Sequence, residues 1–260
     1  MRRGISHQGH PRDIIVKWLR TLLIFDRGGI AATSDWHTVH ESYVRSIFRI
    51  DFPAGSGTLT LRQKTRRSDG QWNRNGVGYL RERFLDHMVH DEGWQAEGCF
   101  RLDHANVAPE LRLYPDMEPY REPVKSKFGG FDFVFEAPEG LRVAIEWETG
   151  NISSSHRSMN KLAIALISGA LDAAILIVPS RDLYEHLTDR VGNIAELSGY
   201  LSMWKDLEAR VQHGLLAITV VEHDELTGDP RHPYLKVGVD GRAAEGQAKR
   251  TESPPAASED

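Results

Sequence analysis

Apolar side chains in the first third of the chain recur at the spacing of amphipathic helices. Residues 11–25 place isoleucine, leucine and tryptophan at intervals of three and four, and Pro11 suits a first helical turn. Residues 34–48 repeat this spacing directly after a serine and an aspartate that could cap a helix. A third run of the same kind covers residues 77–91. The pattern therefore predicts a helical N-terminal third.

The rest of the chain alternates between strand-like and helix-like segments. The run at 173–178 is continuously apolar, which is typical of a strand in the middle of a sheet. Residues 153–167 and 181–212 have helical spacing, and the second of these is expected to be interrupted near Gly192 or Gly199. Alternation and flanking turn residues predict strands at 95–102, 130–136, 141–148, 173–178 and 215–222.

This order of segments predicts an α/β fold with a mixed central β-sheet flanked by helices. A single domain is expected over residues 1–240, with its sheet at about 94–222, since the chain shows no internal repeat. Residues 241–260 are small and polar and contain proline, which predicts a disordered tail.

Composition excludes some classes of protein. The chain has 260 residues with 32 Lys and Arg against 37 Asp and Glu, a formal charge of −5, so it is no histone-like polycation. Local positive charge could still bind DNA. Its single cysteine, Cys99, cannot form an intramolecular disulfide, and no apolar run is long enough to cross a bilayer. A reducing cytoplasm and no membrane association are expected.

A basic segment follows the second predicted helix. Residues 62–83 contain seven Lys and Arg and two acidic residues. Two interpretations stay open, a solvated loop or a surface that contacts DNA phosphates. If the second holds, Lys64, Arg66 and Arg67 are the candidate phosphate contacts.

Acidic side chains converge on the predicted hairpin of residues 130–148. Strand alternation puts Phe131, Phe133 and Phe135 on one face and Asp132 on the other, and a turn near Glu139 sets Asp132 opposite Glu146. Glu148 shares the face of Glu146 and Ala144. Three carboxylates so close repel one another, and Mg²⁺ would neutralise them. The alternative is a set of ordinary solvent-facing acids on an edge hairpin.

Asp132 on one strand, Glu146-Trp147-Glu148 on the next and a helix directly afterwards form a motif that resembles a known family. These residues are similar to the PD-(D/E)xK nuclease fold, with Glu where most members have Lys, as in the type II restriction endonucleases of the BamHI, BglII and BstYI group. The resemblance covers about 129–204. It implies that Asp132, Glu146 and the Trp147 carbonyl bind Mg²⁺, and that Glu148 orients or deprotonates the attacking water.

The resemblance also implies residues that contact DNA bases. Asn151, Ser153 and Arg157 follow the last carboxylate, and Asp189 and Arg190 stand further on, as in that group. Asn suits adenine, Arg guanine and Asp the cytosine amino group. The alternatives are that Asn151 and Ser153 cap a helix and that Asp189 and Arg190 form a surface ion pair.

Two assignments stay open. The family uses a further acidic or amide group upstream of the Asp, for which Glu82 is the preferred candidate and Glu118 is possible. Lys161, on the helix after the motif, could approach phosphate but is interpreted as a helix-surface lysine.

The expected function is sequence-specific cleavage of double-stranded DNA by a Mg²⁺-dependent type II restriction enzyme. The resemblance implies a homodimer, a palindromic site centred on GATC with outer G·C pairs, and a cognate methyltransferase as a genetic partner. The alternatives are a structure-selective or repair nuclease of the same fold and a DNA-binding module without catalytic activity.

Overall fold

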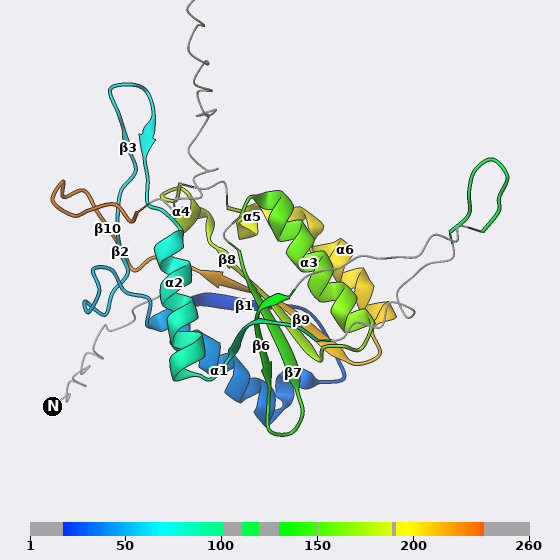
Figure 1. Ribbon diagram of the computed structural model, residues 1–260. Helices are drawn as coiled ribbons and strands as arrows, with labels where there is room; N and C mark the ends of the chain where they lie inside the picture. Colours follow the sequence, from blue (N-terminus) through cyan, green and yellow to red (C-terminus); the bar gives the residue numbers. More distant parts are fainter. Residues whose placement is uncertain (1–17, 101–110, 120–129, 149, 189–190, 237–260) are drawn as a thin grey trace, which may run out of the picture.

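The computed structural model describes residues 18–100, 111–119, 130–148, 150–188 and 191–236. Its centre is a six-stranded mixed sheet with the order β1-β9-β8-β7-β6-β5 (Figure 1). The strands are β1 (Trp18–Arg27), β5 (Gln95–Gly98), β6 (Phe131–Glu136), β7 (Arg142–Trp147), β8 (Ala173–Pro179) and β9 (Gly214–Val221). The mixed α/β fold predicted from the sequence is confirmed.

The middle of the sheet is parallel and its sides are antiparallel. β7, β8 and β9 run parallel to one another, and every residue of β8 and β9 is buried. β6 pairs antiparallel with β7, β5 antiparallel with β6, and β1 antiparallel with β9. The continuous apolar run at 173–178 was therefore a correct indicator of a central strand.

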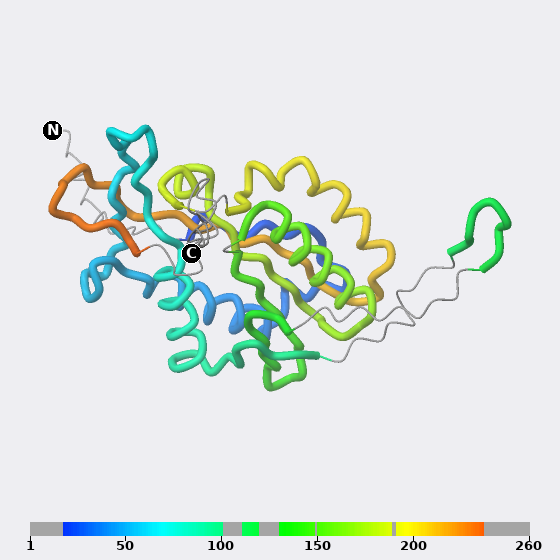
Figure 2. The backbone as a smooth tube through the Cα atoms, turned by 45° about the horizontal axis from the view of Figure 1, so that its top comes forward, coloured from blue at the N-terminus to red at the C-terminus, as the bar shows by residue number. Residues whose placement is uncertain are grey.

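Helices cover both faces of this sheet. Figures 1 and 2 show α1 (Ser34–Phe48) and α2 (Gly78–Asp86) on one side, and α3 (Ile152–Ile167) and α6 (Leu201–Asp206) on the other. Each side has its own buried apolar cluster, one including Tyr43 and Phe84, the other including Trp204. A π-helical turn, η2 (His87–Asp91), continues α2.

The predicted helix at 11–25 is wrong where the structure describes it. Residues Trp18–Arg27 form the edge strand β1, and the segment 11–17 lies outside the described residues. The register of β1 against β9 shifts between Trp18 and Arg20 and again between Leu23 and Phe25. Two such irregularities break strict alternation, so the apolar residues fall at intervals that imitate a helix.

The predicted helical region 181–212 is divided into short pieces. They are α4 (Arg181–Tyr184), α5 (Ile194–Leu197), η4 (Ser198–Tyr200), α6 and η5 (Leu207–Arg210). Side chains of Ser180 and Asn193 cap the starts of α4 and α5. Side-chain caps at two points explain why the helix does not run through. The predicted tail 241–260 lies outside the described residues.

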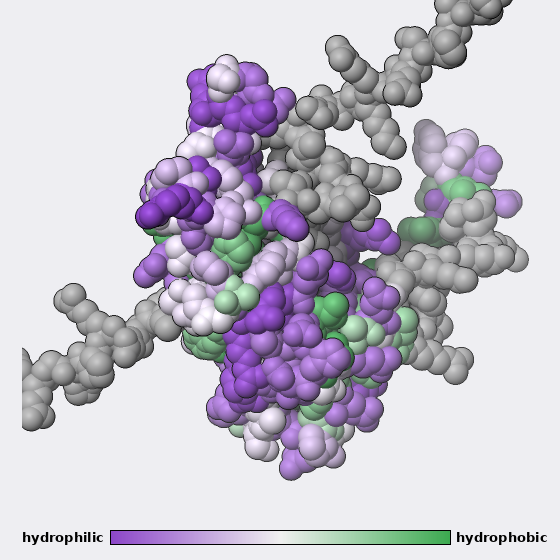
Figure 3. Space-filling view, turned by 60° about the vertical axis from the view of Figure 1, so that its left-hand side comes forward, coloured by the Kyte–Doolittle hydropathy of each residue, from purple (hydrophilic) through white to green (hydrophobic). Residues whose placement is uncertain are grey.

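Two small sheets stand beside the main one. β2 (Thr60–Arg62) pairs parallel with β10 (Glu225–Thr227), and β3 (Thr65–Arg66) pairs antiparallel with β4 (Trp72–Asn73). The tip between β3 and β4 is exposed, and it forms the hydrophilic top of the molecule in Figure 3. Among the described residues, no helix is long and apolar enough to cross a membrane.

Buried Asn75 joins this region to the main body. Its side-chain amide donates to the carbonyls of Arg62 and His186 at 2.8 and 3.1 Å, and its carbonyl Oδ1 accepts from the Leu235 backbone at 3.2 Å. The Asn75 backbone carbonyl accepts from the amide of Thr188 at 2.8 Å. One side chain therefore fixes three separate stretches of backbone, including the stretch that leads to residue 189.

Candidate active site

The hairpin of β6 and β7 has the register that the sequence predicts. Phe133 pairs with Ile145, and the following pairs run in step to Glu136 and Arg142. This register puts Asp132, one residue before Phe133, level with Glu146, one residue after Ile145. β7 is central and buried, so Glu146 and Glu148 are not the solvent-facing acids of an edge hairpin; each is less than a tenth exposed.

One detail of the predicted alternation is wrong. Phe133 packs in the cluster on the α1 and α2 side, and Phe135 packs against it, but Phe131 belongs to the cluster on the α3 side. The ring of Phe131 lies 4.9 Å from the ammonium group of Lys161 on α3. This contact is between residues thirty positions apart, which strand alternation alone does not reveal.

Asp132 is held from two directions. Its Oδ2 accepts a hydrogen bond of 2.9 Å from the backbone N–H of Trp147, across the hairpin. Its Oδ1 lies 3.4 Å from a guanidinium nitrogen of Arg81 on α2. The first contact ties the carboxylate to the neighbouring strand, and the second gives it a cationic partner that sequence analysis did not single out.

Glu146 is buried and held by α3. One carboxylate oxygen forms an ion pair with Lys161 Nζ, and the other accepts from Ser158 Oγ at 3.4 Å. Burial raises the pKa of Glu146, an effect that the Lys161 ion pair opposes and the nearby charge of Asp132 adds to. Lys161 is 8% exposed, so its interpretation as a helix-surface lysine is wrong.

Glu148 lies at the end of β7, where the chain turns into α3. Its Oε1 accepts a hydrogen bond of 2.5 Å from the backbone N–H of Gly150. The pKa of Glu148 is raised to about 7, chiefly by burial and in smaller part by the charges of Glu146 and Asp132, while nearby Ser155 and the hydrogen bond from Gly150 act in the opposite direction. A carboxyl group with this pKa exchanges protons near neutral pH, as a general base must.

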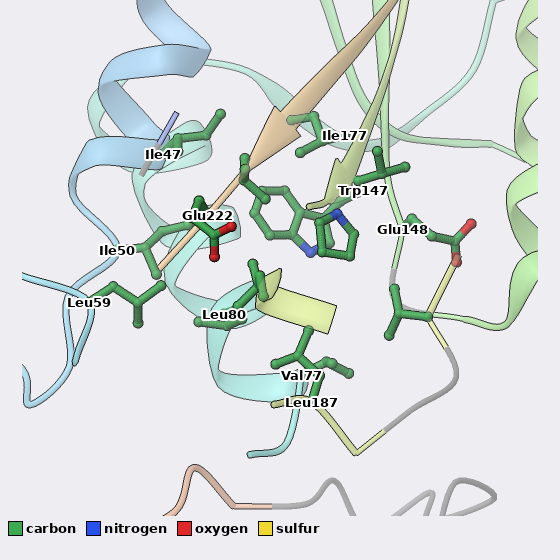
Figure 4. A pocket seen from close by; sticks show the side chains of 15 residues that line it. Ile47, Ile50, Leu59, Val77, Leu80, Trp147, Glu148, Ile177, Leu187 and Glu222 are labelled. Carbon is green, nitrogen blue, oxygen red and sulfur yellow. The ribbon is translucent and has the colours of Figure 1, made fainter. Parts of the chain in front are cut away.

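An apolar pocket lies behind the site. Figure 4 shows Trp147 at its centre, with Ile47, Leu80 and Ile177 around it, and the Glu148 carboxylate directed away from these side chains. The Trp147 ring packs 4.4 Å from that of Phe84. The indole thus anchors β7 in the core between the two glutamates.

The three carboxylates suit a divalent cation in chemistry, although they do not form a ready-made cage. No group of three or more His, Cys, Asp or Glu side chains in the described part of the chain is placed to hold a metal. The charge of Asp132 raises the pKa of Glu146, and the charges of Glu146 and Asp132 raise the pKa of Glu148, so the carboxylates repel one another. Arg81 and Lys161 offset this repulsion in part. Oxygen donors of this kind are those that Mg²⁺ takes, so the residues present fit the ion.

The first base-contact candidates lie at the start of α3. Asn151 caps the helix, since its Oδ1 accepts from the backbone N–H groups of Ser153 and Ser154 at 3.0 and 3.3 Å. Asn151, Ser153 and Arg157 are exposed. The prediction that Asn151 caps the helix is therefore confirmed. Because all three side chains are exposed, they are also accessible to DNA.

Asp189 and Arg190 lie outside the described residues. The two residues that follow them are placed. Val191 forms an antiparallel bridge with Asn151, and the Gly192 N–H donates to the Gly150 carbonyl at 3.2 Å. The backbone next to 189–190 is therefore attached to the same turn that carries Glu148 and Asn151.

The structure distinguishes between the two candidates for the additional acidic group. Glu82 is exposed on α2, next to the Arg81 that contacts Asp132. The segment 111–119, which contains Glu118, lies away from the sheet in Figures 1 and 2. Proximity of α2 to Asp132 favours Glu82, and its role stays a prediction.

Sequence reasoning missed the cationic partners of the carboxylates. Ser155, Ser158 and Lys161 recur every three residues on α3; Ser158 and Lys161 contact Glu146, and Ser155 lies near Glu148. Polar residues at the buried positions of an amphipathic helix are a signal that the sequence contains. Arg81 carries no such signal, because its contact depends on how α2 packs.

Comparison with known proteins agrees with this geometry. The sequence profile of the restriction endonuclease BamHI family matches residues 16–242. The chain belongs to the BamHI family of restriction endonucleases. Among its relatives, the type II restriction enzyme OkrAI of Oceanobacter kriegii is 36% identical over 169 residues, 65% of this chain and 74% of that enzyme. The type II restriction enzyme BamHI of Bacillus amyloliquefaciens is 48% identical over 155 residues, 58% of this chain and 62% of that enzyme.

Membership of the BamHI family confirms the resemblance found in the sequence and makes the chain an endonuclease of the restriction class. The aligned region is less than two thirds of the length of BamHI itself.

The basic candidates Lys64, Arg66 and Arg67 lie on or beside the exposed hairpin of β3 and β4. Lys64 Nζ is 3.3 Å from Glu185, and an Arg67 guanidinium nitrogen is 3.0 Å from Asp69. Both pairs are substantially solvent-exposed, and exposed pairs are worth about 1 kcal/mol or less. DNA phosphates could therefore compete for these cations.

Neutralising Lys64, Arg66 and Arg67 with Gln should weaken cognate and non-cognate DNA binding alike. Each lost phosphate contact should lower the slope of log affinity against log salt by about 0.9. Fluorescence anisotropy at several salt concentrations measures this slope. Arg231→Gln, which removes an exposed arginine paired with Asp229, is the matched control. Unchanged affinity at every salt concentration would show that the hairpin is only solvated.

Proposed function

We propose that this chain is a Mg²⁺-dependent, homodimeric endonuclease that cuts double-stranded DNA at a palindrome centred on GATC. The observation that carries the proposal is the short path from catalytic to recognition candidates: Glu146 lies on β7, Glu148 directly follows that strand, and Asn151, the cap of α3, comes three residues after Glu148. Residues that contact the inner bases would then be fixed relative to the cleaved bond.

Asp132, Glu146 and the Trp147 carbonyl would hold the metal ion. When bound, the ion polarises the scissile phosphate and stabilises the leaving oxygen. Glu148 orients the attacking water and accepts its proton, a role that its raised pKa of about 7 supports. Arg81 and Lys161 keep Asp132 and Glu146 in place from opposite faces of the sheet.

The proposed specificity follows from the chemistry of the candidate side chains. Asn151 is suited to adenine, and the pair Asp189 and Arg190 to cytosine and guanine, which favours an outer G·C pair and the site GGATCC. A palindrome matches the two-fold symmetry of a dimer. Such an enzyme would act in the cytoplasm, with a methyltransferase of the same specificity as its genetic partner.

Digestion of a random-sequence DNA library, with and without Mg²⁺, tests the proposal directly. We expect the recovered ends to share GATC, and Arg190→Ala to relax the outer position while GATC dependence is kept. A good base contact is worth roughly 1–3 kcal/mol, which predicts about a tenfold or greater loss of outer-pair discrimination. Arg210→Ala, on the exposed side of η5, is the control.

Ends without GATC would refute the core assignment, and GATC with other flanks would refute only the outer pair. Cutting at branched DNA irrespective of sequence would instead indicate a structure-selective nuclease. Binding without any Mg²⁺-dependent nicking of plasmid would indicate a DNA-binding module.

A further inference from the structure

Lys161 is a buried cation to which the catalytic scheme gives no chemical step. Its side chain is about one tenth exposed, forms an ion pair with Glu146, and donates to the carbonyl of Gly130 at 2.8 Å. The ammonium also lies over the Phe131 ring. Gly130 and Phe131 directly precede Asp132, so one amine contacts both strands that carry the candidate metal ligands.

Its place on α3 is part of a repeated arrangement. Ser155, Ser158 and Lys161 lie on the same face of the helix because they are three residues apart. Ser155 lies near Glu148 and lowers its pKa, and Ser158 and Lys161 contact the two oxygens of Glu146. This face of α3 thus directs polar donor groups toward Glu146 and Glu148, and among the three groups Lys161 alone carries a charge.

A buried carboxylate needs a positive charge close to it. An unpaired anion in a protein interior is strongly destabilising, and a second carboxylate nearby adds to the cost. Glu146 is 7% exposed and feels the charge of Asp132. Arg81 is directed to Asp132 rather than to Glu146, so Lys161 supplies the counter-charge for Glu146.

We propose that Lys161 is a positioning residue that stands in for the metal: it holds the Glu146 carboxylate and offsets its charge, so that the two metal-binding strands fold together before Mg²⁺ arrives. The inference rests on the proposed function only in taking Glu146 as a metal ligand. It makes a distinct claim, that Glu146 and Lys161 are coupled in the metal-free protein.

The test is a double-mutant cycle on the full chain, followed by thermal unfolding in EDTA and in MgCl₂. Lys161→Met should lower the Tm in EDTA by roughly 10 °C, because breaking a buried pair leaves its partner uncompensated. Adding Glu146→Gln to Lys161→Met should recover at least half of that loss. Mg²⁺ should raise the Tm of Lys161→Met by more than it raises that of the wild type, because the ion replaces the missing charge.

The exposed pair of Lys205 on α6 and Glu208 on η5 is the matched control. Its N···O distance is 2.6 Å, yet the Lys205 side chain is about half exposed, so the same cycle with Lys205→Met and Glu208→Gln should show a coupling below about 2 °C.

If Lys161→Met is insoluble, recovery of soluble protein by added Glu146→Gln supports the proposal, and failure to recover it overturns it. A loss of Tm that neither Glu146→Gln nor Mg²⁺ reduces overturns it as well. Cleavage by Glu146→Gln alone is measured separately: wild-type activity there would refute the metal role of Glu146, while the cycle in EDTA would still decide the role of Lys161.

Discussion

Asp132→Asn should abolish DNA cleavage and leave specific binding intact. The amide keeps an oxygen that can accept from the Trp147 N–H, so the contact across the hairpin survives. It loses the negative charge that a divalent cation requires, and it repels phosphate less. We expect a fall in cleavage rate of at least about a hundredfold, typical of removing one group that stabilises a charged transition state.

Parallel gel-shift and cleavage assays on the same DNA measure this effect. Loss of the partly exposed contact with Arg81 should cost about 1 kcal/mol of stability, so the variant should fold. Asp206→Asn, at the exposed end of α6, is the control and should cut normally. Substantial Mg²⁺-dependent cutting by Asp132→Asn would contradict the assignment of the site.

The metal-free protein should lose stability as the pH rises from about 4.5 to about 7, and Glu148→Gln should remove much of this loss. Glu148 has a folded-state pKa of about 7 against 4.5 for the free side chain, so the folded state binds the proton more tightly. Its contribution is fully present below pH 4.5 and is lost as the carboxyl ionises in the folded protein. A shift of this size corresponds to about 3 kcal/mol.

Urea unfolding in EDTA at about pH 5 and pH 8 measures the difference between wild type and Glu148→Gln. Glutamine can accept the same hydrogen bond from Gly150, so the turn should be kept. Glu139→Gln, on the exposed turn of the hairpin, should follow the wild-type profile. Identical pH dependence in wild type and Glu148→Gln would show that Glu148 titrates normally.

The sequence predicted those parts of the site that depend on local pattern. Alternation and a turn near Glu139 are sufficient to place Asp132 level with Glu146, because register in a hairpin follows from its turn. The spacing of apolar residues was enough to predict α3, and the helix begins one residue before the predicted start. Local pattern also placed Asn151 at the helix cap.

Contacts between segments distant in the sequence could not be predicted from local pattern. The ion pair of Lys161 with Glu146 and the contact of Arg81 with Asp132 depend on how α3 and α2 lie against the sheet. The strand β1 was mistaken for a helix because its pairing with β9 is irregular at two points. Each of these results is set by tertiary packing, which overrides local propensity.

The cap of α3 has a consequence for the way this protein can discriminate between bases. Asn151 Oδ1 already accepts from the Ser153 and Ser154 amides, and losing such a cap costs about 0.5–2 kcal/mol. A base contact through Oδ1 has to exceed this amount, whereas a contact through the amide N–H₂ leaves the cap in place. Under the proposed role of Asn151, a weak partner that engages Oδ1 therefore falls below a free-energy threshold set by the helix cap.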